Sequence, residues 1–166
     1  MVFGNANLLT MFFMGDLMNP LLRCILISLI VASCQAAHAT NTSSAGLVKS
    51  LEGDVRVERN GQTITALPGS TLMQGDVIQT GSNGKVGLIL YDDTVISMGC
   101  NSKIALDSFL FDPNEKQLSL VTRIFSGTMT YISGQIAKLA PSKATIETPY
   151  ATIGSRGTHL FIKVEE

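Results

Sequence analysis

Apolar and polar residues alternate in short runs through most of the chain. In Asp54–Glu58 and in Lys85–Tyr91, every second residue is apolar, which places those side chains on one face of an extended strand. Strands of about five residues, with turn signals roughly every 8–12 residues, are typical of an all-β roll, sandwich or barrel. The pattern predicts one all-β domain over 46–164, preceded by a small, polar and flexible lead-in over 40–45.

Turn residues predict where several of these strands end. Asn60-Gly61 is a strong two-residue hairpin signal because both positions accept a positive φ. Gly81–Gly84 predicts a further hairpin-type connection, and Asp92-Asp93 predicts a turn between two strands.

Helix is expected at two places at most. Leu118, Val121 and Phe125 have helical spacing, but the residues around them suit a strand as well. Gly134–Ala140 is long enough for one or two helical turns before Pro141 ends them. The expected fold therefore contains no more than one or two short helical turns.

The first 39 residues have the order of a secretory signal peptide. Arg23 precedes the apolar run Cys24–Ala32, which is too short to span a membrane, and Ala37–Ala39 forms an A-x-A cleavage site. The residues before Met18 are themselves apolar, so Met18 is the expected natural start. The order predicts cleavage after Ala39 and a periplasmic or secreted protein.

A second processing route is open. Val31–Cys34 resembles a bacterial lipobox, in which Cys34 would carry lipid and anchor the chain in the cell envelope. Either route leaves Cys100 as the one free thiol of the mature chain. Because its surroundings are apolar, we expect Cys100 to be buried.

Composition and charge exclude several classes of function. The chain is 45% hydrophobic and 15% charged, and its net charge of −1 gives no attraction to nucleic acid or anionic lipid. Asp92-Asp93 lacks the series of oxygen ligands that calcium requires, and His159 stands alone. No catalytic, metal or cofactor site is therefore predicted, and the protein is not expected to be an enzyme.

Five segments in order carry a resemblance to a known family. They are Gly53–Val57, Leu67–Gly81, Val86–Met98, Phe125–Lys138 and Ile146–Thr158. In this order they resemble the FecR domain, a bacterial regulatory module outside the inner membrane. The resemblance implies a β-solenoid-like or rolled β-sandwich fold and a role in envelope signalling.

The chain departs from the regulators that name the family. Those proteins pass a signal through a transmembrane helix to a cytoplasmic anti-sigma segment, and this sequence shows neither. We expect a stand-alone, non-enzymatic FecR-domain protein that acts by contact with another envelope protein. A glycan- or peptidoglycan-binding domain is the alternative, although such a site favours exposed aromatic residues and the chain has no Trp.

The closing motif supplies the candidate recognition residues. They are Thr148, Pro149, Arg156, Gly157 and Thr158. An arginine in an apolar β context needs acceptors for its donors, so Arg156 is expected to pair internally with Asp92, Asp93 or Glu147. A contact with a partner is the alternative for this residue.

Overall fold

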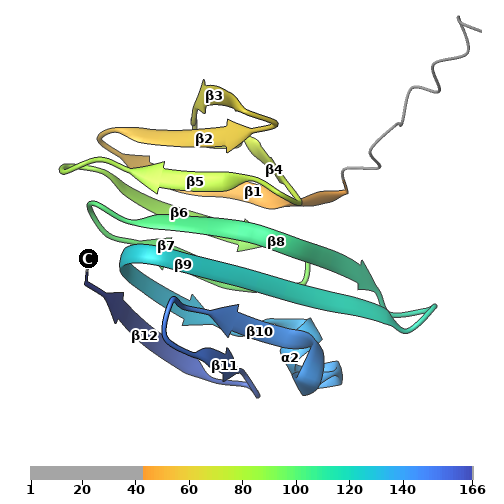
Figure 1. Cartoon of the computed structure of the whole chain (residues 1–166). Coiled ribbons are helices and arrows are strands. Elements are labelled where there is room, and N and C mark those ends of the chain that lie inside the picture. Colours follow the sequence, from red (N-terminus) through yellow and green to blue (C-terminus); the bar gives the residue numbers. More distant parts are fainter. Residues whose placement is uncertain (1–42, 166) are drawn as a thin grey trace, which may run out of the picture. The chain divides into compact units, whose positions relative to one another are not determined.

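A computed structural model describes residues 43–165. They form a curled, mostly antiparallel sheet with one short helix (Figure 1). The elements are β1 (Ser44–Glu52), β2 (Val55–Arg59), β3 (Gln62–Thr65), β4 (Thr71–Met73), β5 (Val77–Thr80), β6 (Lys85–Leu90), β7 (Val95–Met98), β8 (Lys103–Asp112), β9 (Gln117–Ile132), α2 (Gln135–Leu139), the 3-10 turn η1 (Pro141–Lys143), β10 (Ala144–Glu147), β11 (Thr152–Gly154) and β12 (His159–Val164).

The sheet curls into two half-sheets that share β9. The first half-sheet has the order β3-β2-β5-β8-β9-β10-β11, and the second has the order β4-β1-β6-β7-β9-β12. Figure 1 shows β1, β6 and β7 behind the strands of the first half-sheet. The rolled β arrangement expected from the sequence is therefore confirmed.

Strand β9 passes from one half-sheet to the other near Gly127. The residues before it pair with β8, and those after it pair with β7 and β12. Gly127 has a φ of 88°, and a Cβ at this position would collide with Ser102. The segment with helical spacing is thus a strand, because β8 and β10 satisfy its backbone while Leu120 and Ile124 face the core.

The two half-sheets enclose one apolar core. The alternation in β2 and β6 puts every second side chain inside, as the sequence predicts. The largest fully buried side chains come from both half-sheets and from α2: Leu72, Ile78, Leu88, Ile96, Ile104, Leu106, Leu120, Ile124, Met129, Tyr131, Ile136 and Ile146. Because they form a single cluster, the described residues constitute one folded unit.

The predicted turns differ in outcome. Asn60 and Gly61 both have positive φ, 52° and 76°, and join β2 to β3 in the expected hairpin. Gly81–Gly84 also turns, but β5 and β6 do not pair with each other. The hairpin expected there is wrong, because this turn carries the chain from the first half-sheet into the second.

Of the N-terminal predictions, only the end of the lead-in over 40–45 falls on described residues. Strand β1 begins at Ser44 and Ala45 is fully buried, so the last two residues of the predicted lead-in over 40–45 belong to the sheet. The predicted signal peptide over 1–39, with Met18 and Cys34, lies outside the described residues. Within residues 43–165, no helix has the length and apolar character needed to cross a membrane.

Candidate functional site

A buried carboxylate organises the region beneath the closing motif. Asp92 follows β6 and is fully buried. Its Oδ1 accepts a hydrogen bond from the backbone N–H of Thr94 at 3.1 Å, and its Oδ2 accepts one from the Thr94 hydroxyl at 2.8 Å. Oδ2 also accepts from the N–H of Ile136 in the first turn of α2, at 3.2 Å. These bonds provide the compensation that a buried charge requires.

The same turn fixes the start of α2 through the backbone. The N–H of Gln135 donates to the carbonyl of Asp92 at 2.6 Å, and the N–H of Gly134 donates to Thr94 Oγ1 at 3.1 Å. Asp93 adopts a φ of 66° and accepts a bond from Gln135 Nε2 at 2.7 Å. The pair Asp92-Asp93 thus forms the predicted turn, and it also acts as an anchor for α2.

Tyr131 extends this polar network toward the closing motif. Its side chain is almost fully buried, and this burial raises the pKa of its hydroxyl, while hydrogen bonding to Thr94 and Ser155 acts in the opposite direction. Ser155 is also buried, and its hydroxyl lies 3.0 Å from that of Thr158. A series of buried polar groups therefore connects Asp92 with the loop between β11 and β12 and stabilises that loop.

The first part of the motif forms the tip of the β10–β11 hairpin. Thr148 Oγ1 accepts hydrogen bonds from the N–H groups of Tyr150 and Ala151, at 3.2 and 2.9 Å. Pro149 lies between Thr148 and Tyr150, and Tyr150 is 81% exposed. The tip is therefore a defined turn that presents an aromatic side chain to solvent.

Arg156 corrects one sequence-based expectation. Its side chain is exposed, and it has no ion pair within residues 43–165. Of the expected acceptors, Glu147 pairs with Arg123 at 2.8 Å, Asp93 binds Gln135, and Asp92 is occupied as above. The predicted internal pair of Arg156 is therefore wrong.

The other loop residues have separate roles. Gly157 has a φ of 66°, which explains a glycine there, whereas Gly154 has open space around it and no positive φ. The carbonyl of Thr158 accepts bonds from Ser133, which fixes the start of β12. The three residues of β11, about 10 Å of extended chain, separate the hairpin tip from Arg156. The candidate recognition residues thus form two separate groups.

Two other arginines, Arg59 and Arg123, pair with carboxylates inside the described fold. Arg59 Nε and Nη2 donate to the two carboxylate oxygens of Asp76, each at 2.7 Å, and Asp76 is fully buried. Arg123 lies between Asp107 and Glu147, at 3.0 and 2.8 Å. Sequence reasoning missed both arrangements, although Asp76 directly after the turn residue Gly75 was a signal for the first.

Cys100 is exposed, which contradicts its predicted burial. Met98, two residues earlier, is buried, but β7 ends there and Asn101 has a φ of 50°, so the alternation of faces does not continue. Cys100 lines an open cavity of about 430 Å³ with residues at the end of β12. Within the part of the chain that the structure describes, no group of acidic, histidine and cysteine side chains is arranged for a metal.

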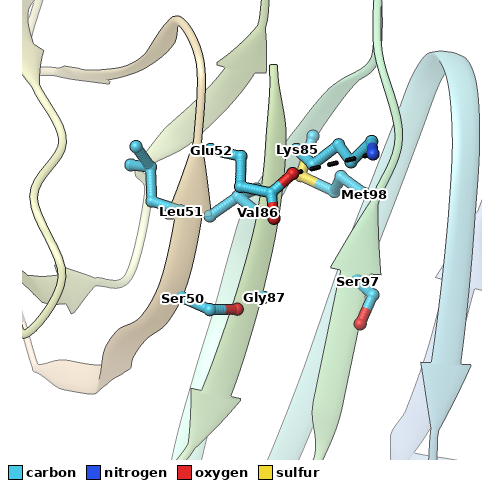
Figure 2. Close-up of a pocket in the computed structure, with 8 residues that line it drawn as sticks. All are labelled: Ser50, Leu51, Glu52, Lys85, Val86, Gly87, Ser97 and Met98. Carbon is cyan, nitrogen blue, oxygen red and sulfur yellow. Dashed lines mark ion pairs between the residues drawn. The ribbon is translucent and has the colours of Figure 1, made fainter. Parts of the chain in front are cut away.

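A second surface pocket of about 300 Å³ lies across β1, β6 and β7. Figure 2 shows the residues that line it. Gly87 leaves space between Ser50 and Ser97, and Lys85 pairs with Glu52 at 3.6 Å. Both charged side chains of this pair are largely exposed. Such a shallow, solvated surface differs from the enclosed apolar pockets in which small molecules usually bind.

Comparison with known proteins identifies the family. A sequence model described as FecR protein matches residues 76–166. The chain belongs to the FecR family. No curated protein and no solved structure matches it. The match covers Asp92, Tyr131 and the closing motif, while β1–β4 precede it and complete the same sheet and core. The FecR family is associated with regulators of envelope signalling, and its domain is regulatory and not catalytic.

Proposed function

We propose that this FecR-domain protein is exported to the periplasm or secreted, and acts there without catalysis by binding another protein of the cell envelope. Export rests on the signal-peptide order that ends at Ala39, with a lipid anchor at Cys34 as the alternative route. Membership of the family supports an envelope role. The binding mode rests on the β10–β11 hairpin.

Tyr150 is the observation that carries this proposal. It is the most exposed large apolar side chain among the described residues. Thr148 accepts hydrogen bonds from the backbone N–H groups of Tyr150 and Ala151 and so orders this turn. The backbone of the turn therefore loses little conformational entropy on binding. Exposed tyrosines on ordered loops are frequent anchors of protein–protein contacts, because they bury a large area with few rotatable bonds.

Two residues with reactive side chains lie apart. His159 begins β12, whereas Cys100 lines the cavity at the other end of that strand, beside Val164. Five residues of extended chain place them about 16 Å apart along β12. They cannot act together as nucleophile and base.

The aromatic residues give less support to a glycan platform. Tyr131 is buried, and the exposed residues Tyr91, Tyr150 and Phe161 belong to three different elements. Strands β7 and β9 separate the end of β6, where Tyr91 lies, from Phe161 on β12. At about 4.8 Å per strand, these two side chains start roughly 14 Å apart.

A capture experiment from envelope extract tests the binding mode. The bait protein should retain a specific envelope protein, and Tyr150→Ala should weaken that capture at least about tenfold, as expected for an interface hot spot. Tyr91→Ala removes another exposed tyrosine and should capture as the unchanged protein does. Equal capture by Tyr150→Ala, or retention of sacculus-derived glycan instead of a protein, would contradict the proposal.

Export has its own test. N-terminal sequencing of the protein from its native cells should start at Thr40, or at an acylated Cys34. A cytoplasmic chain that retains residues before Leu29 would contradict it.

A further inference from the structure

Within residues 43–165, strand β12 pairs with another strand along one edge only. It pairs with the end of β9 on one side, and Figure 1 shows it at the border of the second half-sheet. The N–H of Ser133 donates to the carbonyl of Thr158, so these two opposite residues form a hydrogen-bonded pair. In an antiparallel ladder such pairs recur at every second residue. The even-numbered residues of β12 therefore bond to β9. The backbone groups of His159, Phe161 and Lys163 point to the open edge.

This edge exposes one large aromatic side chain, Phe161, between the polar residues His159 and Lys163. Phe161 is 70% exposed on the outer face, and Ile162 and Val164 reach the core from the inner face. Soluble proteins usually protect such edges because they can template pairing with another strand. A regular strand of six residues is long enough to accept a partner strand.

We propose that β12 pairs antiparallel with β12 of a second copy of this chain, across a two-fold axis at Phe161. The dimer goes beyond the proposed function, because it uses a different strand from the hairpin that carries Tyr150.

The position of the axis follows from the hydrogen-bonding pattern. With the axis at Phe161, this residue faces its own copy, and His159 faces Lys163 of the second copy. All three outward-facing residues of each strand then join the ladder. A shift of the axis by one residue in either direction leaves one of them unpaired in each copy.

Side chains on both faces agree with this register. On the outer face, the two Phe161 rings become direct cross-strand neighbours, a favourable aromatic pair. On the inner face, Leu160 lies opposite Ile162 of the second copy, and both residues already contact the core. A closed two-fold contact of this kind needs one self-complementary surface and produces a dimer and not a filament.

The register also gives Arg156 an acceptor. Strand β12 ends at Val164 and the loop that holds Arg156 precedes His159, so the antiparallel pairing brings Glu165 of one copy toward the Arg156 loop of the other. Glu165 pairs with Lys163 in its own chain through Oε1, at 2.5 Å, and Oε2 makes no hydrogen bond among the described residues. Arg156 is an exposed cation without an ion pair in residues 43–165, so opposite charges meet twice in the dimer.

Analytical ultracentrifugation of the purified protein tests whether β12 forms the proposed dimer interface. The unchanged protein should sediment with twice the mass of the chain, and Phe161→Glu should weaken dimerisation at least about tenfold, because it brings two carboxylates together in place of the ring pair. Tyr150→Glu changes an even more exposed aromatic residue outside this edge and should remain dimeric. A monomeric unchanged protein, or a Phe161→Glu variant that dimerises as well as the original, would overturn the proposal.

A charge exchange tests the register. Arg156→Glu and Glu165→Arg should each weaken the dimer several-fold, and the double variant should recover most of the affinity, because the pair is restored with its signs reversed. These positions are exposed, so circular dichroism should show an unchanged fold. Failure of the double variant to recover would contradict the axis at Phe161.

Discussion

Arg59 and Arg156 are placed in opposite ways by the same fold. Arg59 ends β2, and its guanidinium donates to both carboxylate oxygens of the buried Asp76 and to the carbonyl of Thr71 at 2.8 Å. Arg156 lies in the loop after β11 and extends into solvent. One arginine is part of the internal structure, and the other is available for contact.

Strand register explains the difference. Glu58 pairs with Val77 across β2 and β5, so the next position in that ladder brings Arg59 opposite Asp76. Arg156 lies beyond the last pair of the β10–β11 ladder, where Thr145 faces Gly154, and no strand in the described part of the chain lies opposite it. In this fold, the arginine that pairs internally is the one opposite which a neighbouring strand supplies a carboxylate in register.

The largest effect should come from the paired region. Asp76→Ala leaves the Arg59 guanidinium and the N–H of Met73 without their acceptor. Breaking a buried ion pair from one side costs about 3–5 kcal/mol of unfolding free energy, a large share of the roughly 5–15 kcal/mol of a small domain. Urea unfolding monitored by circular dichroism measures the loss.

Asp54→Ala is the matched control for this variant. Asp54 also pairs with an arginine, Arg56, at 2.9 Å, but both side chains are about half exposed or more. Solvent screens such a pair, so we expect a loss of no more than about 1 kcal/mol. Similar losses for Asp54→Ala and Asp76→Ala would contradict the distinction.

Asp92→Asn should have an intermediate effect. An amide nitrogen in place of one carboxylate oxygen would face donors instead of accepting from Thr94 and Ile136. We expect a loss of roughly 1–3 kcal/mol, the cost of leaving buried polar groups unsatisfied. Asp93→Asn is the control, because Asp93 is exposed and asparagine tolerates its φ of 66°. Equal urea midpoints for the two variants would show that the Asp92 network stabilises little.

Tyr131→Phe should have a smaller effect, which depends on pH. Near neutral pH, loss of the hydroxyl should cost about 1 kcal/mol. Burial raises the pKa of Tyr131 in the folded protein, so above about pH 10 the unfolded chain releases this proton first and unfolding becomes easier. The urea midpoint of the unchanged protein should fall more than that of Tyr131→Phe between about pH 8 and pH 11. Equal decreases of the two urea midpoints would contradict the raised pKa of Tyr131.

Local pattern was enough to predict much of the fold. The alternation around Leu88 decides which side chains enter the core, and Asn60-Gly61 decides a turn, because both depend on neighbouring residues alone. The split of β5 and β6 between two half-sheets depends on which distant strands they pair with, and Gly81–Gly84 suits either outcome. That part of the topology was not accessible from the sequence.

The same limit of sequence-based prediction applies to the candidate site. The family motif located Thr148, Pro149 and the Arg156–Thr158 loop, but their separation by β11 became visible only in the fold. The network of Asp92, Tyr131 and Ser155 joins residues far apart in the chain. No spacing rule in the sequence could have connected them.

The most direct test of the comparison measures how much each of the two arginines contributes to the free energy of unfolding, in one monomeric variant. Arg59→Ala and Arg156→Ala are each combined with Phe161→Glu, so that dimerisation does not contribute to stability, and unfolded with urea. We predict a loss of about 3–5 kcal/mol for Arg59→Ala and a change within about 0.5 kcal/mol for Arg156→Ala. A loss for Arg156→Ala as large as that for Arg59→Ala would place Arg156 inside the folded structure and contradict the account.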